Sequence, residues 1–341
     1  MIRNRPQGAD IIDIVIKEKR AFVGYPPVYE NKWEQENNFT DVMFDISNSN
    51  EDDWQAFKEN WRLQNKKNGN LYSLRNTAEY RNLLRDIEWE RNEYSEKSII
   101  AVPRPSEGVV YLGEYDGFEL VNNPTWAETY INHRKTNQHE IEDRASHLRD
   151  VVQSFKVNEW KAVSLALIPA WIRRTLFGRS TVARFHPVVI DQSKTLHPHT
   201  YLKKLFDEPN TLDAIHEKDT FISLINLFRP EPFEHLVVAL MQCEYPELRW
   251  LHVGGSGDGG VDGIAFNETG TTKYLIQCKW QWYGDDVALE AKDDRKIITA
   301  YLLGPEKADT STRKYLDGKK IARLVEKHRH VLPQAKAMGL L

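Results

Sequence analysis

Three polar residues in the C-terminal third of the chain combine side-chain types that hydrolyse phosphodiesters. Asp262 follows a glycine-rich loop, and Gln277 and Lys279 stand two positions apart in an otherwise apolar segment. Burying such groups without partners costs roughly 1–3 kcal/mol each, so their presence there needs a reason. A carboxylate and a neighbouring oxygen ligand can hold Mg²⁺, while a lysine positions water and offsets charge in the transition state. The pattern therefore predicts a metal-dependent phosphodiesterase site.

Neighbouring strands are needed to bring these residues together. The β-forming residues around the glycine-rich loop predict three short strands, at residues 249–253, 261–266 and 274–280. Since side chains alternate along a strand, Gln277 and Lys279 share one face of the third strand. A hairpin turn around residues 267–272 would then place Asp262 beside them.

A helix is predicted to begin after Pro232, because proline suits the first turn and the following apolar residues share one helical face. These apolar residues are Phe233, Leu236, Val237 and Leu240. Glu234 then lies in the first turn, where an acid complements the helix dipole or serves as an accessory acid of the site. His235 and His252 are interpreted as structural residues, and Asp258 as a turn former.

The order and spacing of these motifs resemble the catalytic core of the Mrr-type restriction endonucleases, a branch of the PD-(D/E)XK nuclease superfamily. The resemblance covers residues 230–300 and rests on Phe233-Glu234, Gly257-Asp258-Gly259-Gly260-Val261-Asp262-Gly263 and Gln277-Cys278-Lys279. It implies an α/β fold with a central mixed sheet flanked by helices, and cleavage of DNA phosphodiesters with Mg²⁺, for which Mn²⁺ would substitute. It also implies a role in restricting foreign or modified DNA, as in antiviral defence.

The resemblance assigns a role to each motif residue. Asp262 becomes the principal metal ligand, Gln277 the second ligand, Lys279 the catalytic lysine, and Glu234 an accessory acid that helps to bind the metal. The superfamily has an acid where this chain has Gln277, although the Mrr branch accepts glutamine there. Fewer carboxylates then hold the ion, so Glu234 matters more.

The composition is that of a globular protein with two cores. The chain has 341 residues, of which 40% are hydrophobic and 28% charged. Its apolar runs are shorter than the roughly 18–20 residues of a membrane-spanning helix, and no signal-peptide pattern follows Met1. We expect a cytoplasmic protein without a membrane partner, in which Cys243 and Cys278 are reduced packing residues.

Charge is distributed unevenly along the chain. Residues 30–60 hold nine acids and two lysines and should avoid phosphate, whereas residues 144–207 hold eleven basic and four acidic residues. The basic stretch is either a phosphate-binding face or a solvated surface. The candidate DNA contacts in it are Arg173, Arg174, Arg179 and Arg184. A basic helix predicted over residues 314–329 would add a second flank, or an ordinary solvated face.

The N-terminal half predicts a β-rich α+β domain. Strands are expected at residues 21–25 and 99–102, each stopped by proline, and a helix at residues 76–94. Asp116-Gly117 predicts a tight hairpin turn. This half loosely resembles the PUA and EVE domains, which read modified bases. Seven of the ten tryptophans precede residue 188, and aromatic faces of that kind could hold an extruded base.

We therefore predict an N-terminal specificity or sensor domain over residues 1–187, a connector over 188–230 and a nuclease domain over 231–341. The expected partner is DNA, with or without modified bases. A homodimer is also expected, because a double-strand break needs two active sites. Two alternatives stay open: a pseudo-nuclease that binds nucleic acid or a partner without cutting, and a nuclease activated by a ligand or partner that the N-terminal domain senses.

Overall fold

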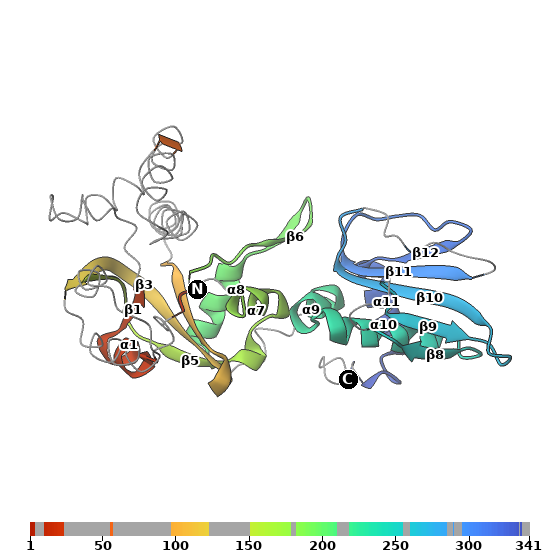
Figure 1. Ribbon diagram of the computed structural model, residues 1–341, viewed down its shortest axis with the longest axis horizontal. Helices are drawn as coiled ribbons and strands as arrows, with labels where there is room; N and C mark the ends of the chain where they lie inside the picture. Colours follow the sequence, from red (N-terminus) through yellow and green to blue (C-terminus); the bar gives the residue numbers. More distant parts are fainter. Residues whose placement is uncertain are drawn as a thin grey trace, which may run out of the picture. The chain divides into compact units, whose positions relative to one another are not determined.

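The structure is a computed structural model that describes residues 1–3, 10–23, 55–56, 97–122, 151–178, 182–209, 218–254, 260–284, 289, 295–333 and 335. The chain divides into two compact units (Figure 1). Unit 1 comprises Met1–Ala166, Arg174–His186 and Pro198–Asn210, and unit 2 comprises Leu167–Arg173, Pro187–His197 and Thr211–Leu341. The predicted mixed α/β class is confirmed. In the described part of the chain, no helix is long and apolar enough to cross a membrane.

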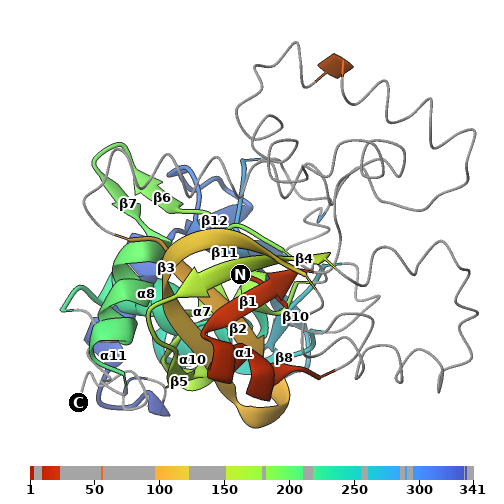
Figure 2. The ribbon, with the colours of Figure 1, turned by 90° about the vertical axis from the view of Figure 1, so that its left-hand side faces the viewer.

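Unit 1 is built on an antiparallel sheet of five strands in the order β1-β4-β3-β2, with β5 also paired to β3 (Figure 2). The strands are β1 (Arg20–Val23), β2 (Ile99–Arg104), β3 (Val109–Asn122), β4 (Val151–Val157) and β5 (Lys161–Ser164). The helices assigned to this unit are α1 (Ile12–Glu18), the 3₁₀ turn η2 (Pro105–Glu107) and α8 (Pro198–Asp207). A small core of Ile11, Val15 and Phe22 joins α1 to β1.

The hairpin predicted at Asp116-Gly117 is wrong. Strand β3 runs through both residues without interruption for 14 residues, and its pairing with β4 shifts register between Tyr115 and Gly117. Gly117 has a φ of +139°, so the glycine serves a β-bulge and not a turn. The strand continues because β4, more than thirty residues later, supplies the partner that the local sequence did not reveal.

The strand predicted to stop before Pro103 is longer than expected, and other N-terminal predictions fall outside the described residues. Strand β2 includes Pro103 and ends at Arg104, since an edge strand tolerates a proline without an N–H. The helix predicted at residues 76–94 lies outside the described residues. The same holds for the acidic stretch 30–60, apart from residues 55–56.

Unit 2 holds the segment with the candidate motifs. Its strands are β6 (Val188–Asp191) and β7 (Lys194–Leu196), which form a separate hairpin, followed by β8 (Arg249–His252), β9 (Gly263–Phe266), β10 (Thr272–Gln281), β11 (Lys296–Leu303) and β12 (Arg313–Leu316). Its helices are α9 (Thr220–Leu227), α10 (Pro230–Glu244) and α11 (Gly318–His328). The 3₁₀ turn η5 (Leu165–Leu167) and helix α7 (Ala170–Leu176) are each divided between the two units, since the assignment changes after Ala166 and after Arg173.

The main sheet of unit 2 has the order β12-β11-β10-β9-β8. β8, β9 and β10 pair antiparallel, whereas β10, β11 and β12 pair parallel. The three strands predicted around the glycine-rich loop are thus present, and β9 and β10 form the predicted hairpin. The sheet is mixed, as the resemblance implies.

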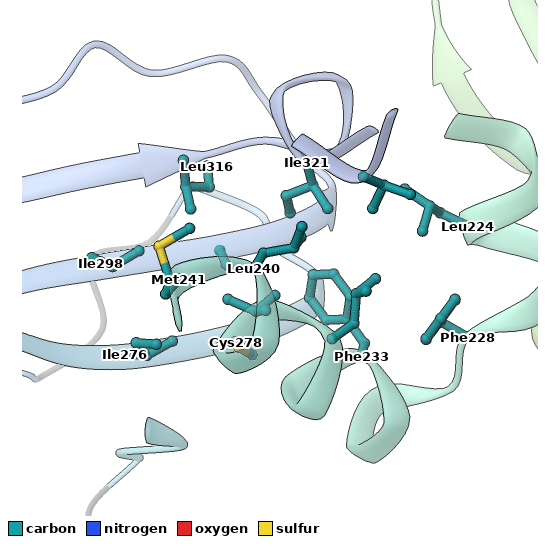
Figure 3. Packing of buried hydrophobic residues seen from close by; sticks show 14 of the residues in the cluster. Leu224, Phe228, Phe233, Leu240, Met241, Ile276, Cys278, Ile298, Leu316 and Ile321 are labelled. Carbon is teal, nitrogen blue, oxygen red and sulfur yellow. The ribbon is translucent and has the colours of Figure 1, made fainter. Parts of the chain in front are cut away.

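Helices α10 and α11 cover one face of this sheet. The predicted apolar stripe of α10 is buried, and Figure 3 shows Phe233 and Leu240 gathered with Ile276 and Cys278 of β10. Alternation along β10 therefore turns Gln277 to the opposite face from this core. The core contacts hold β10 in register beneath α10 and so position the polar residues on its other side.

Two element boundaries differ from the predictions. Helix α10 begins at Pro230, because proline is accepted at the first helical position, and Glu234 therefore lies in the second turn and not in the first. The helix predicted over residues 314–329 starts only at Gly318, with Asp317 accepting a hydrogen bond from Lys320 N at 2.8 Å as its cap. Lys314 lies instead on β12, where pairing with β11 decides its conformation.

Candidate active site

Asp262 lies at the start of the β9–β10 hairpin, against the backbone of the Gln277-Cys278-Lys279 segment. Its N–H donates to Ile276 O at 2.8 Å, and its Oδ2 accepts a hydrogen bond from Cys278 N at 2.6 Å. Cys278 stands between Gln277 and Lys279, so this carboxylate is held beside both motif residues. The structure thus brings Asp262 to the segment where the sequence predicts it.

Gln277 is fully buried, with 0% of its surface exposed. Its Nε2 donates to Gly260 O at 3.0 Å, whereas its Oε1 has no partner among the described residues. Gly260 has a φ of +83°, and a Cβ there would lie 2.9 Å from the Gln277 Nε2. The backbone of Gly260 therefore orients the amide so that its oxygen remains a buried acceptor.

The Cys278 thiol is buried and lies within the electrostatic influence of three motif residues. Burial raises the pKa of Cys278 well above its ordinary value, and the negative charges of Asp262 and Glu234 raise it further, whereas the charge of Lys279 lowers it. The charges of Asp262, Glu234 and Lys279 thus all act on one position of β10.

Glu234 is paired with His252, a histidine predicted to be structural. Its Oε2 lies 3.0 Å from His252 Nε2, and both side chains are partly buried. The His252 ring in turn stacks on His235, with 3.9 Å between the ring centroids. A Cβ on Gly254, two residues after β8, would lie 2.8 Å from the Glu234 Oε2, so a larger residue there would require Glu234 to shift. His252 positions Glu234, a role that its strand alternation with buried Trp250 could have indicated.

A polar pair beside Gln277 was also missed. Thr299 on β11 is the cross-strand partner of Gln277 and is equally buried. Its Oγ1 accepts a hydrogen bond from Arg313 Nη1 at 3.1 Å. The sequence pattern does not predict that Thr299 lies beside Gln277, because only the pairing of β10 with β11 makes them neighbours.

The four predicted DNA-contact arginines are divided between the units. Arg173 belongs to unit 2, whereas Arg174 and Arg184 are exposed residues of unit 1. Arg179 lies outside the described residues. Burial, and then the charge of Arg229, lower the pKa of Arg173.

The residues present are suited to a hard divalent cation. A carboxylate and a buried amide oxygen without a hydrogen-bond donor are the oxygen ligands that Mg²⁺ and Mn²⁺ prefer. In the described ranges, no group of three His, Cys, Asp or Glu residues could hold a metal ion. Any ion would therefore depend on the Gln277 oxygen in addition to Asp262. The loop residue Asp258 lies outside these ranges.

Comparison with known proteins identifies the class to which this site is similar. The family model Mrr_cat, described as a restriction endonuclease, matches residues 225–298. The matched segment extends from α9 into β11 and includes all four motif residues. No curated protein and no solved structure matches the chain. The match supports a restriction-type endonuclease whose substrate is DNA, whereas nothing in these comparisons supports the PUA/EVE resemblance of the N-terminal half.

Proposed function

We propose that this chain is a metal-dependent endonuclease that hydrolyses DNA phosphodiester bonds. One observation carries the proposal: within the segment similar to restriction endonucleases, the Asp262 carboxylate is bonded to the backbone between Gln277 and Lys279. This arrangement gathers a carboxylate, an amide oxygen and an ammonium group at one place on the sheet.

Each residue has a separate role in the proposed reaction. Asp262 and the Gln277 Oε1 would hold Mg²⁺, for which Mn²⁺ would substitute, and the bound ion would polarise the phosphate and lower the pKa of a water molecule. Lys279 would orient the attacking water and offset the charge that develops on the phosphate oxygens. Glu234, oriented by His252, would supply a second carboxylate from α10.

The test is cleavage of a supercoiled plasmid with Mg²⁺, with EDTA, and by the Asp262→Asn variant. The matched control is Glu268→Gln, since Glu268 is an exposed acid in the turn of the same hairpin. We expect wild type and the control to cut only with metal, and Asp262→Asn to cut about 10²–10³-fold more slowly. Duplex binding that is insensitive to EDTA, with no cutting by wild type, would instead favour the pseudo-nuclease.

Preference for modified DNA, a part in defence and a homodimer stay predictions. A second plasmid that carries modified cytosine tests the first of them, because faster cutting of that plasmid would make residues 1–187 a specificity domain. Cutting of plain DNA only after a ligand or partner protein is added would make the same region a sensor. Sedimentation of the intact chain tests the dimer.

A further inference from the structure

Arg173 and Arg229 form a pair of like charges in unit 2. Arg173 lies on α7 and Arg229 is the N-cap of α10. Trp171, two residues before Arg173, donates from its Nε1 to the Oδ1 of Asn226, three residues before Arg229, at 3.1 Å in a buried hydrogen bond that ties α7 to α9. Among the described residues, the Arg173 Nε is buried without an acceptor. The charge of Arg229 also lowers the pKa of Arg173, after burial.

This arrangement is unfavourable for a protein without a ligand. A buried guanidinium N–H that lacks an acceptor pays its desolvation cost, and a second cation nearby adds repulsion. No ion pair joins either arginine to an acid in the described ranges. A phosphate diester relieves both penalties, because its oxygens accept from the planar guanidinium fork and its negative charge offsets the repulsion between the two cations.

Arg229 lies at the same end of the sheet as the candidate active site. Phe228 O, just before Arg229, accepts a hydrogen bond from Trp280 Nε1 at 2.8 Å, and Trp280 directly follows Lys279. Arg229 O accepts from Phe233 N at 3.0 Å, which places Glu234 little more than one helical turn away. The positive end of the α10 dipole also favours an anion at this position.

We infer that Arg173 and Arg229 bind a backbone phosphate of the DNA next to the bond that is cut. The inference rests on the proposed function and deepens it, because it names a contact that holds the duplex in register with Lys279. A free inorganic phosphate presents the same chemistry, so the experiment distinguishes the two sources.

The first measurement is fluorescence anisotropy of a labelled DNA duplex in EDTA, over a series of salt concentrations, with the full chain. We expect Arg173→Gln and Arg229→Gln each to weaken binding about tenfold and to reduce the slope of log Kd against log salt by about 0.9, the value of one phosphate contact. Arg229→Lys keeps the charge and should keep the slope. The control is Arg249→Gln, since exposed Arg249 pairs with Phe266 at the far end of the strands from Asp262.

Thermal unfolding in phosphate-free buffer separates an anion site from a structural arginine. Arg229→Gln should have the Tm of wild type or a higher one, because it removes repulsion from Arg173, whereas loss of a structural contact would lower Tm. If Arg173→Gln does not fold, the Arg229→Gln variant still tests the inference, because Arg229 is exposed. Inorganic phosphate should raise the Tm of wild type and not that of Arg229→Gln.

The inference would be overturned if both glutamine variants bound the duplex with the affinity and salt slope of wild type. In that case, cleavage of DNA by the wild type would still leave the proposed function intact. A loss of the phosphate effect on Tm with unchanged duplex binding would assign the pair to free phosphate and overturn the DNA contact. A wild type that neither binds nor cuts duplex DNA would overturn both proposals.

Discussion

The carboxylate of Asp262 and the backbone N–H of Cys278 are joined across the β9–β10 hairpin by a hydrogen bond of 2.6 Å. A bond from a neutral N–H to a carboxylate is stronger than one between neutral groups and fixes the carboxylate in place. The acid is therefore held against the segment whose alternate residues, Gln277 and Lys279, complete the motif. The hairpin alone assembles the central part of the candidate site.

Removing the charge of Asp262 should separate activity from stability. In Asp262→Asn an amide oxygen can still accept from Cys278 N, so we expect a loss of only about 1 kcal/mol in the free energy of unfolding. Cleavage should fall by about 10²–10³-fold, the scale seen when an electrostatic contact of the transition state is lost. Urea unfolding and plasmid nicking measure the two effects, and an active Asp262→Asn would contradict the assigned role.

Gly260→Ala should displace Gln277. The added Cβ would lie 2.9 Å from the Gln277 Nε2, at a backbone φ of +83° that favours glycine. The matched control is Gly270→Ala, because Gly270 has a similar φ of +79° but has open space around its Cβ. Both variants should lose about 1 kcal/mol of stability from the backbone, whereas only Gly260→Ala should lose cleavage, by tenfold or more. Equal activity in the two variants would contradict a role for Gln277.

Gln277→Glu should make stability depend on metal. Glutamate cannot donate to Gly260 O and places a charge in a buried position, so in EDTA we expect a loss of about 1–3 kcal/mol. Mg²⁺ or Mn²⁺ should restore part of it by binding the folded state, and the rise in Tm with metal should exceed that of wild type. Calorimetry with and without the ion measures this, and no added effect of metal would argue against a cation at Gln277.

Glu244→Gln should flatten the acid limb of the stability profile. Hydrogen bonds from His328 and then Lys327 of α11 hold the pKa of Glu244 on α10 below its ordinary value of 4.5. Because the folded state lowers this pKa, the pairing stabilises the protein above about pH 4.5, and the contribution disappears as the pH falls through the lowered pKa.

Above that pH, we expect Glu244→Gln to lose up to about 1 kcal/mol relative to wild type. The difference should shrink toward zero in acid. Chemical unfolding at a series of pH values checks the trend. A difference that stays constant into acid would mean that shape and not charge joins the two helices here.

Local patterns predicted much of unit 2. Alternation and β-forming residues place β8, β9 and β10, and helical spacing places the buried stripe of α10. Two of the failures share one cause. Asp116-Gly117 forms a bulge because β3 pairs with β4 on both sides of it. Lys314 lies on β12 because that strand pairs with β11. In both cases a distant strand overrode a local preference.

The amino-acid pattern encodes the order and types of the motif residues and the hairpin that brings Asp262 to Gln277 and Lys279. These features depend on short-range pairing, which the side-chain pattern encodes directly. Long-range packing instead brings Glu234 to His252 and puts Arg173 within the electrostatic influence of Arg229. Such contacts join separate elements, and only the packing of helices on the sheet, driven by burial of apolar surface, brings those elements together.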